Sequence, residues 1–264
     1  MNHMSKSLTL SLVQTDNVWE NIQENLDQLS AKLADLDKDT DIILVPELFS
    51  TGFTMEAAKV AETMEGKGIS WMKELSSRKN SLVIGSLLIQ EAGHYFNRLI
   101  ASFPDGRLLH YDKRHLFSFA GEDKVFESGQ QRLVFEYKGF KICPLICYDL
   151  RFPVWARNTE EIDLLIYVAN WPNARMLAWD TLLRARAIEN LCYVAGLNRV
   201  GVDGNQLVYV GHSEVYDPMG EKLLNSAPSE EAVYSTTINA AHISETRNKF
   251  SFLNDRDHFK IIND

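Results

Sequence analysis

Cysteine is scarce in this chain, and long apolar runs are absent. The 264 residues include three cysteines, an odd number without Cys-x-x-Cys spacing, which predicts neither a disulfide framework nor a zinc site. No run reaches the ~18 uncharged apolar residues that a membrane helix needs. The first ten residues hold no long apolar segment, so we expect no secretory signal and a reduced, cytoplasmic protein.

Positive charge is also in deficit. The chain has 27 basic and 36 acidic residues, which gives a formal net charge of −9. Such a surface repels phosphate backbones and anionic lipids, so neither nucleic acid nor a membrane is expected as a partner. A local basic site for a small anion is compatible with this balance. Hydrophobic residues make up 45% of the chain, enough for a large core.

Short apolar strands alternate with helical stripes. Residues 8–13 alternate like a strand, and apolar residues three and four apart between positions 19 and 36 predict a helix. Residues 41–45 are almost wholly apolar, as in a strand buried on both faces. Two hairpins are predicted further on, one around the turn Pro104-Asp-Gly106 and one around Lys138-Gly139.

The same patterns continue to the end of the chain. Helices are expected at 68–79, 174–190 and 240–247, and strands at 82–89, 163–169, 192–197, 207–216, 221–224 and 232–238. Because hairpins interleave with strand–helix–strand passes, we expect two packed sheets with helices outside rather than one doubly wound sheet. No linker, charge block or repeat interrupts the sequence, so we expect a single domain over residues 1–264.

Three reactive side chains each follow a predicted apolar strand. Glu47 comes after 42–46, Lys113 comes after the second strand of the first hairpin, and Cys147 ends the run 141–146. Sites in α/β proteins are assembled at the carboxyl ends of strands, so these side chains are expected at one rim.

These residue types suit the hydrolysis of an amide. Cys147 would be the nucleophile, and Lys113 would lower the pKa of its thiol from the usual ~8.5. Lys113 and the backbone N–H of Tyr148 would stabilise the tetrahedral oxyanion. Glu47 would take the thiol proton, give a proton to the departing ammonia, and later activate water.

Each residue also has an ordinary structural explanation. A glutamate after a buried strand is commonly a surface or capping carboxylate, and a basic cluster such as Lys113-Arg-His115 is commonly a solvated loop. A free cysteine is often a small buried hydrophobe, which we expect for Cys143 and Cys192.

Two other classes of function stay open on residue types alone. A metal-dependent phosphoesterase would use Glu47, Asp112, Asp149 and His212 as ligands, but it would leave Cys147 without a role. A non-catalytic interaction module is the other alternative.

The order of motifs resembles that of one enzyme family. The segments Pro46-Glu47-Leu-Phe49, Tyr111-Asp-Lys113-Arg-His-Leu-Phe117 and Ile146-Cys147-Tyr-Asp-Leu-Arg-Phe-Pro153 resemble the catalytic motifs of the nitrilase superfamily of carbon–nitrogen hydrolases. Their separations, 66 and 34 residues, are also similar to those of the family. The resemblance covers about residues 7–250 and leaves a C-terminal tail at 251–264.

The resemblance implies a fold and a set of residues. It implies a four-layer α-β-β-α sandwich, two mixed sheets with helices outside, that pairs through a helical face into a homodimer and in some cases a higher oligomer. It implies a triad of Glu47, Lys113 and Cys147 that works without a metal or an organic cofactor. It also implies that Glu122 holds Lys113 and orients the substrate.

Two further segments, Leu116–Glu122 and Asn170–Arg175, are most similar to the omega-amidase branch. Those enzymes hydrolyse the terminal amide of small dicarboxylic monoamides such as 2-oxoglutaramate or 2-oxosuccinamate. An N-carbamoyl or aliphatic amidase is the alternative within the family.

A substrate with a free carboxylate needs a cation besides the catalytic lysine, and arginine offers a bidentate partner. Arg151 is the first candidate, with a structural pair to Asp149 or to a nearby glutamate as its other explanation. The remaining candidates for substrate contact are His115, Phe119, Trp171 and Arg175.

Overall fold

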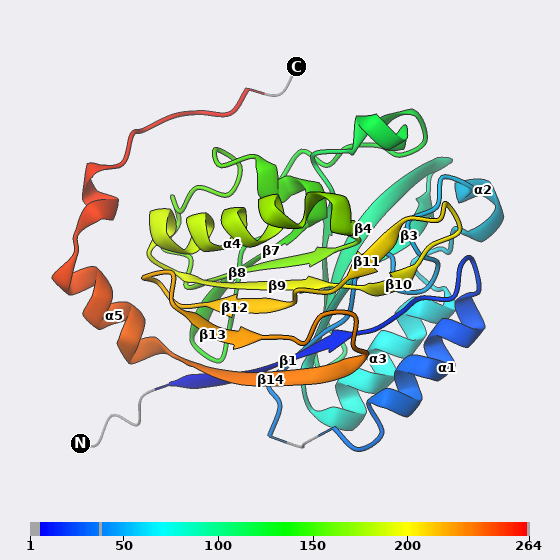
Figure 1. Cartoon of the computed structure of the whole chain (residues 1–264), viewed down its shortest axis with the longest axis horizontal. Helices are drawn as coiled ribbons and strands as arrows, with labels where there is room; N and C mark the ends of the chain where they lie inside the picture. The colour runs from blue at the N-terminus through cyan, green and yellow to red at the C-terminus, as the bar shows by residue number, and fades with distance from the viewer. Residues whose placement is uncertain (1–5, 37–38, 263–264) are drawn as a thin grey trace.

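Two six-stranded sheets form the centre of the computed structural model, which describes residues 6–36 and 39–262 (Figure 1). The two ends of the predicted domain, 1–5 and 263–264, lie outside the described residues. The first sheet has the order β14 (Ala232–Asn239), β1 (Ser7–Gln14), β2 (Ile42–Leu44), β3 (Leu82–Glu91), β4 (His94–Ser102) and β5 (Leu108–Asp112). The second has the order β13 (Lys222–Asn225), β12 (Glu214–Tyr216), β9 (Tyr193–Asn198), β8 (Leu164–Ala169), β7 (Phe140–Ile146) and β6 (Phe135–Tyr137).

Both sheets are mixed. Strands β1, β2 and β3 run parallel, as do β7, β8 and β9, and antiparallel strands flank each group. The last strand, β14, pairs antiparallel with the first, from Ser7 opposite Asn239 to Gln14 opposite Ala232. A separate ribbon of β10 (Val200–Val202) and β11 (Val208–Val210) lies beside the second sheet.

The helices cover the outer faces of the sheets. Helices α1 (Ile22–Lys32) and α3 (Lys67–Lys79) pack on the first sheet, and α4 (Met176–Asn190) and α5 (Ala240–Lys249) lie on the side of the second. A single turn, α2 (Ala57–Val60), is added near the rim. None of the helices in the described part of the chain is long and apolar enough to span a bilayer.

Alternating side chains explain the layers. In β1, Leu10 and Leu12 face the second sheet and join a core with its strands, whereas Val13 packs with α1 and α3. The core between the sheets therefore includes residues from both. The four-layer α-β-β-α sandwich that the resemblance implied is confirmed.

One expected strand is wrong. The sequence predicted a strand near 207–216, but β11 and β12 are separate and belong to different sheets. Gly211 and His212 between them have φ of 77° and 59°, and this left-handed backbone breaks the extended chain. The short strand β10 was not predicted.

Candidate active site

The structure brings together the three residues that follow apolar strands. Glu47 comes after β2, Lys113 directly after β5, and Cys147 directly after β7. The Nζ atom of Lys113 lies 2.8 Å from Oε1 of Glu47, and both side chains are fully buried. Cys147 lies beside them, with 9% of its surface exposed.

A second buried carboxylate completes the environment of Lys113. Glu122, in the 3-10 helix Glu122–Lys124, lies with its two oxygens 3.0 and 2.9 Å from Nζ. An ammonium has three N–H donors. Glu47 and Glu122 together place three carboxylate oxygens within hydrogen-bonding distance of Nζ, and Lys113 also lines the pocket.

Two asparagines, which the sequence interpretation did not include, fix the carboxylates. Asn97 in β4 donates to Glu47 Oε1 at 2.9 Å and to Glu122 Oε1 at 3.2 Å. The backbone N–H of Asn170 donates to Glu47 Oε2 at 2.7 Å, and its side-chain amide donates to the Glu47 carbonyl. The sequence feature that could have indicated them is a polar amide side chain that lies among apolar residues, within a predicted strand or just after it.

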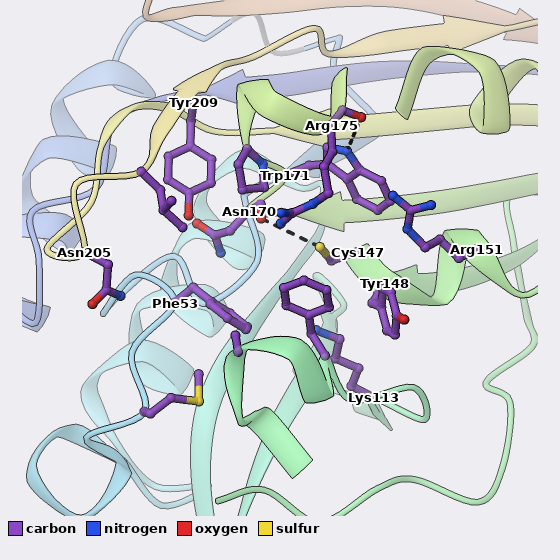
Figure 2. A pocket seen from close by; sticks show the side chains of 15 residues that line it. Phe53, Lys113, Cys147, Tyr148, Arg151, Asn170, Trp171, Arg175, Asn205 and Tyr209 are labelled. Atoms are coloured by element: carbon purple, nitrogen blue, oxygen red, sulfur yellow. Dashed lines mark hydrogen bonds between the residues drawn. The ribbon is translucent and has the colours of Figure 1, made fainter. Parts of the chain in front are cut away.

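Cys147 lies at the pocket end of this network. Its Sγ lies 3.9 Å from the carbonyl oxygen of Asn170, the contact drawn in Figure 2. Burial, and next the negative charge of Glu47, raise the pKa of the Cys147 thiol well above its ordinary value, while Lys113 acts in the opposite direction. Lys113 thus acts in the expected direction, but burial and the carboxylates outweigh it, so the expectation of a thiol pKa below its ordinary value is wrong. The resting nucleophile is a thiol, and a base must take its proton during attack.

The charges of the lysine and the second glutamate are also shaped by burial. Burial acts to lower the pKa of Lys113, but Glu122 and Glu47 outweigh it and raise that pKa above its ordinary value. Lys113 is thus a permanent cation at neutral pH. Burial raises the pKa of Glu122, against the effect of Lys113, and the charge of Glu47 adds to the rise.

A pocket opens directly over Cys147 (Figure 2). It contains about 610 Å³ of empty space, part of it open to solvent. Its wall is mainly apolar and aromatic, with Phe53, Phe117, Tyr148, Trp171 and Tyr209 among its residues.

Two arginines give the pocket its positive charge. The guanidinium carbon of Arg175 lies 4.9 Å from the ring centre of Phe117, and that of Arg151 lies 4.9 Å from the ring centre of Trp171. Figure 2 shows the Arg175 side chain extending toward Cys147, with Arg151 beside the indole. Within residues 6–36 and 39–262, neither guanidinium forms an ion pair or a hydrogen bond. By contrast, five buried or partly buried arginines each pair with a carboxylate: Arg98, Arg132, Arg186, Arg199 and Arg247.

The structure corrects some candidates for substrate contact. His115 does not line the pocket, because its ring donates to Asp149 and stacks on Phe152. Phe119 is 87% exposed and does not line the pocket, whereas Phe117 does. Since Asp149 binds His115, it is also not the structural partner expected for Arg151.

The ligands considered for a phosphoesterase do not converge. Asp112 pairs with Arg98, Asp149 binds His115, His212 pairs with Asp180, and Glu47 binds Lys113. In the described part of the chain, the one group of three metal-ligating side chains is Asp180, His212 and Glu214. Glu214 in that group is already bound to Lys222 and Tyr216.

Comparison with known proteins agrees with this arrangement. The sequence model of the carbon-nitrogen hydrolase family matches residues 9–248. Omega-amidase YafV of Yersinia enterocolitica is 42% identical over 97% of this chain and 99% of its own length. 2-Oxoglutaramate amidase of Bacillus subtilis is 30% identical over 94% of this chain and 96% of its own length.

A solved structure is similar over the same span. XC1258 of Xanthomonas campestris, a CN-hydrolase superfamily protein with an arsenic adduct in its active site, superposes with a TM-score of 0.94. The two sequences are 44% identical, and the match covers 97% of this chain and 99% of that one. The family match includes both sheets and the segments that carry Glu47, Lys113 and Cys147. The resemblance of the three motifs is thus confirmed, and the chain belongs to the carbon-nitrogen hydrolase family.

Proposed function

We propose that this protein hydrolyses the terminal carboxamide of a small dicarboxylic monoamide, of the 2-oxoglutaramate or 2-oxosuccinamate type. The product would be the dicarboxylate and ammonia, formed through a thioester on Cys147. The observation that carries the proposal is a buried Glu47–Lys113–Glu122 cluster beside a cysteine, under a pocket with two unpaired guanidiniums. The omega-amidase and 2-oxoglutaramate amidase among the relatives support the same substrate class.

The first half of the reaction forms the thioester. Sγ of Cys147 attacks the amide carbon while its proton passes to Glu47, which is needed because the thiol is not ionised at rest. The carbonyl oxygen becomes an oxyanion, which the ammonium of Lys113 and the backbone N–H of Tyr148 stabilise. Glu47 then gives the proton to the amide nitrogen, the C–N bond breaks, and ammonia leaves.

The second half returns the enzyme to its starting state. Glu47 takes a proton from a water molecule, whose oxygen attacks the thioester carbon. The same donors stabilise the second oxyanion. When the C–S bond breaks, the carboxylate product leaves and the sulfur recovers its proton from Glu47. Glu122 accepts hydrogen bonds from Lys113 and holds the ammonium in place while Glu47 cycles.

Arg175 is the proposed partner of the substrate carboxylate. Its guanidinium extends over the pocket toward Cys147 and has no protein carboxylate to compete for it. Arg151 lies beside Trp171 and would add positive charge at longer range. Trp171 would form the wall along the carbon chain of the substrate.

A mass measurement and a substrate panel test this function. Brief incubation with 2-oxoglutaramate should add the mass of its acyl group to Cys147, and Cys147→Ala should show no adduct and no turnover. Cys143→Ala is the matched control, because that thiol is buried in the core, where burial raises its pKa to about 12.

The panel compares 2-oxoglutaramate and 2-oxosuccinamate with N-carbamoyl amino acids, aliphatic amides and simple nitriles. The 2-oxo acid amides should have the highest kcat/KM. If they were the slowest, the assignment within the family would be wrong, and an N-carbamoyl or aliphatic amidase would replace it.

The homodimer and the cytoplasmic location stay predictions. Leu177 and Ile188 on α4 are 82% and 48% exposed, which suits a helical face that a second copy covers. Sedimentation equilibrium should give twice the chain mass, and Leu177→Glu should shift it toward the monomer. A wild-type protein that sediments as a monomer would contradict the dimer.

A further inference from the structure

The nucleophile has a backbone conformation that residues with a side chain rarely adopt. Cys147 has φ of 43°, in the left-handed region, where β7 ends and the 3-10 helix Cys147–Arg151 begins. This conformation is unfavourable for any residue with a Cβ, so neighbouring contacts must hold the turn. The same turn sets the direction of the next N–H, that of Tyr148.

Asp149 supplies contacts that hold the turn. It is fully buried, and its Oδ2 accepts a hydrogen bond from the backbone N–H of Ile146 at 3.0 Å. This bond joins the residue before Cys147 to the residue two positions after it. The hydroxyl of Tyr111 in β5 donates to the same oxygen at 2.8 Å.

His115 binds the other oxygen of Asp149. Its backbone N–H and its ring Nδ1 lie 3.1 and 2.8 Å from Oδ1. Because a carboxylate oxygen accepts, Nδ1 is the nitrogen that donates. The imidazole also stacks on Phe152, with ring centres 3.7 Å apart and planes 5° from parallel. Phe152 follows the 3-10 helix, so His115 contacts both the middle of the segment that carries Cys147 and Tyr148 and the residue just after it.

His115 is also two residues from Lys113. Its contacts therefore connect the loop that carries the ammonium to the turn that carries the Tyr148 N–H. We propose that His115 is a positioning residue which, through Asp149, sets the relative position of the two oxyanion donors. The inference rests on the function proposed above, and it gives His115 a role in the reaction without contact to substrate.

Three substitutions separate this role from others. His115→Asn places an amide N–H near the position of Nδ1, His115→Gln places it farther out, and His115→Ala removes it. Since displacing oxyanion donors lowers turnover, kcat should fall about 10- to 100-fold in the alanine and glutamine variants, with KM within about twofold of wild type. His115→Asn should recover most of the loss. His110→Ala removes an exposed imidazole from β5 and should leave kcat unchanged.

A second measurement reports on the oxyanion donors directly. An aldehyde analogue of the substrate adds to the Cys147 thiol: the C–S bond forms as the S–H bond and the C=O π bond break, and the proton passes through Glu47 to the former carbonyl oxygen. The oxygen of this tetrahedral hemithioacetal needs the same donors. Its inhibition constant should rise in His115→Ala by about the factor by which kcat falls, and His115→Asn should restore it.

Three outcomes would overturn the proposal. If the variants lose thermal stability but keep kcat and the aldehyde affinity, His115 is only structural. If KM rises at constant kcat, it contacts substrate. If His115→Asn and His115→Gln have the same kcat, the hydrogen bond from Nδ1 to Asp149 does not matter for the reaction. This comparison can be made even if His115→Ala fails to fold. If the wild-type enzyme does not hydrolyse 2-oxo acid amides, the proposed function is refuted but the role of His115 is not. The His115 variants would then be assayed with the best substrate of the panel.

Discussion

Replacing Arg175 by alanine should weaken catalysis selectively for substrates that carry a carboxylate. The guanidinium lies over Phe117 and faces the pocket without a protein partner. Its removal therefore leaves no buried carboxylate unpaired inside the protein. The loss should then reflect the missing interaction with substrate rather than damage to the fold.

The size of the effect follows from the charges. Two unit charges ~4 Å apart attract by about 4 kcal/mol at an effective dielectric constant of ~20, and a charged hydrogen bond contributes about 1.5–3 kcal/mol. Because Arg175 is partly exposed, we expect about 3–4 kcal/mol. At 1.36 kcal/mol for each tenfold change, kcat/KM for 2-oxoglutaramate should fall about 10²- to 10³-fold.

The assay pairs the variant with a change in the substrate. Ammonia release is followed for 2-oxoglutaramate and for a neutral amide of the same chain length, with wild type, Arg175→Ala and Arg151→Ala. The neutral amide should lose less than about threefold in kcat/KM on removal of Arg175, since no carboxylate is present to lose its partner. Arg151→Ala should have the smaller effect on 2-oxoglutaramate.

The control is Arg184→Ala, which removes another arginine that lies over an aromatic ring, Tyr216, outside the pocket. It should leave both substrates unaffected. An equal loss for the charged and neutral amides in Arg175→Ala would refute the reasoning, because the residue would then act on the reaction or the fold and not on the carboxylate.

Three further predictions concern the buried cluster. Iodoacetamide should alkylate Cys147 slowly at pH 7 and faster as pH rises. Glu47→Gln should shift this increase in rate to lower pH, because it removes a negative charge that raises the pKa of the thiol. An unchanged pH profile in the variant would show that Glu47 does not raise this pKa. Glu122→Gln should lower kcat about 10²- to 10³-fold at nearly constant KM in steady-state assays, because Lys113 loses one of the two carboxylates that hold its ammonium in place. A variant with the kcat of the wild type would argue against this role of Glu122. Lys113→Met should lower the free energy of unfolding in urea by about 3–5 kcal/mol, since two buried carboxylates lose their cation. The carboxylates raise the pKa of Lys113 above its ordinary 10.5, so this stabilisation is complete below pH 10.5, and the gap between wild type and variant should shrink as pH rises further.

Much of the secondary structure was predictable because local patterns carry it. The alternation of Leu8, Leu10 and Leu12 predicted β1, and the leucine spacing before residue 36 predicted α1. The break between β11 and β12 was not predictable, because His212 adopts a positive φ that its residue type does not require.

The residues of the candidate site were easier to predict than their protonation states and contacts. Glu47, Lys113 and Cys147 each follow an apolar strand, which indicated one rim. The contacts of Asn97 and Asn170 were missed because a polar residue within or just after a strand does not identify its partner. His115 was among the predicted contacts of the substrate, whereas the structure directs its ring to Asp149.

Most of the strands and helices, the three reactive residue types and the acidic composition could be predicted from the sequence alone, because each of these depends on residues close together in the chain or on composition. Only the tertiary structure decided that β14 pairs with β1 and that Glu47 and Lys113 of one sheet meet Cys147 of the other. It also decided that the thiol pKa is raised. These properties depend on how segments far apart in the sequence pack together and exclude water. A local sequence pattern specifies neither the distance between two such segments nor how far their side chains are buried.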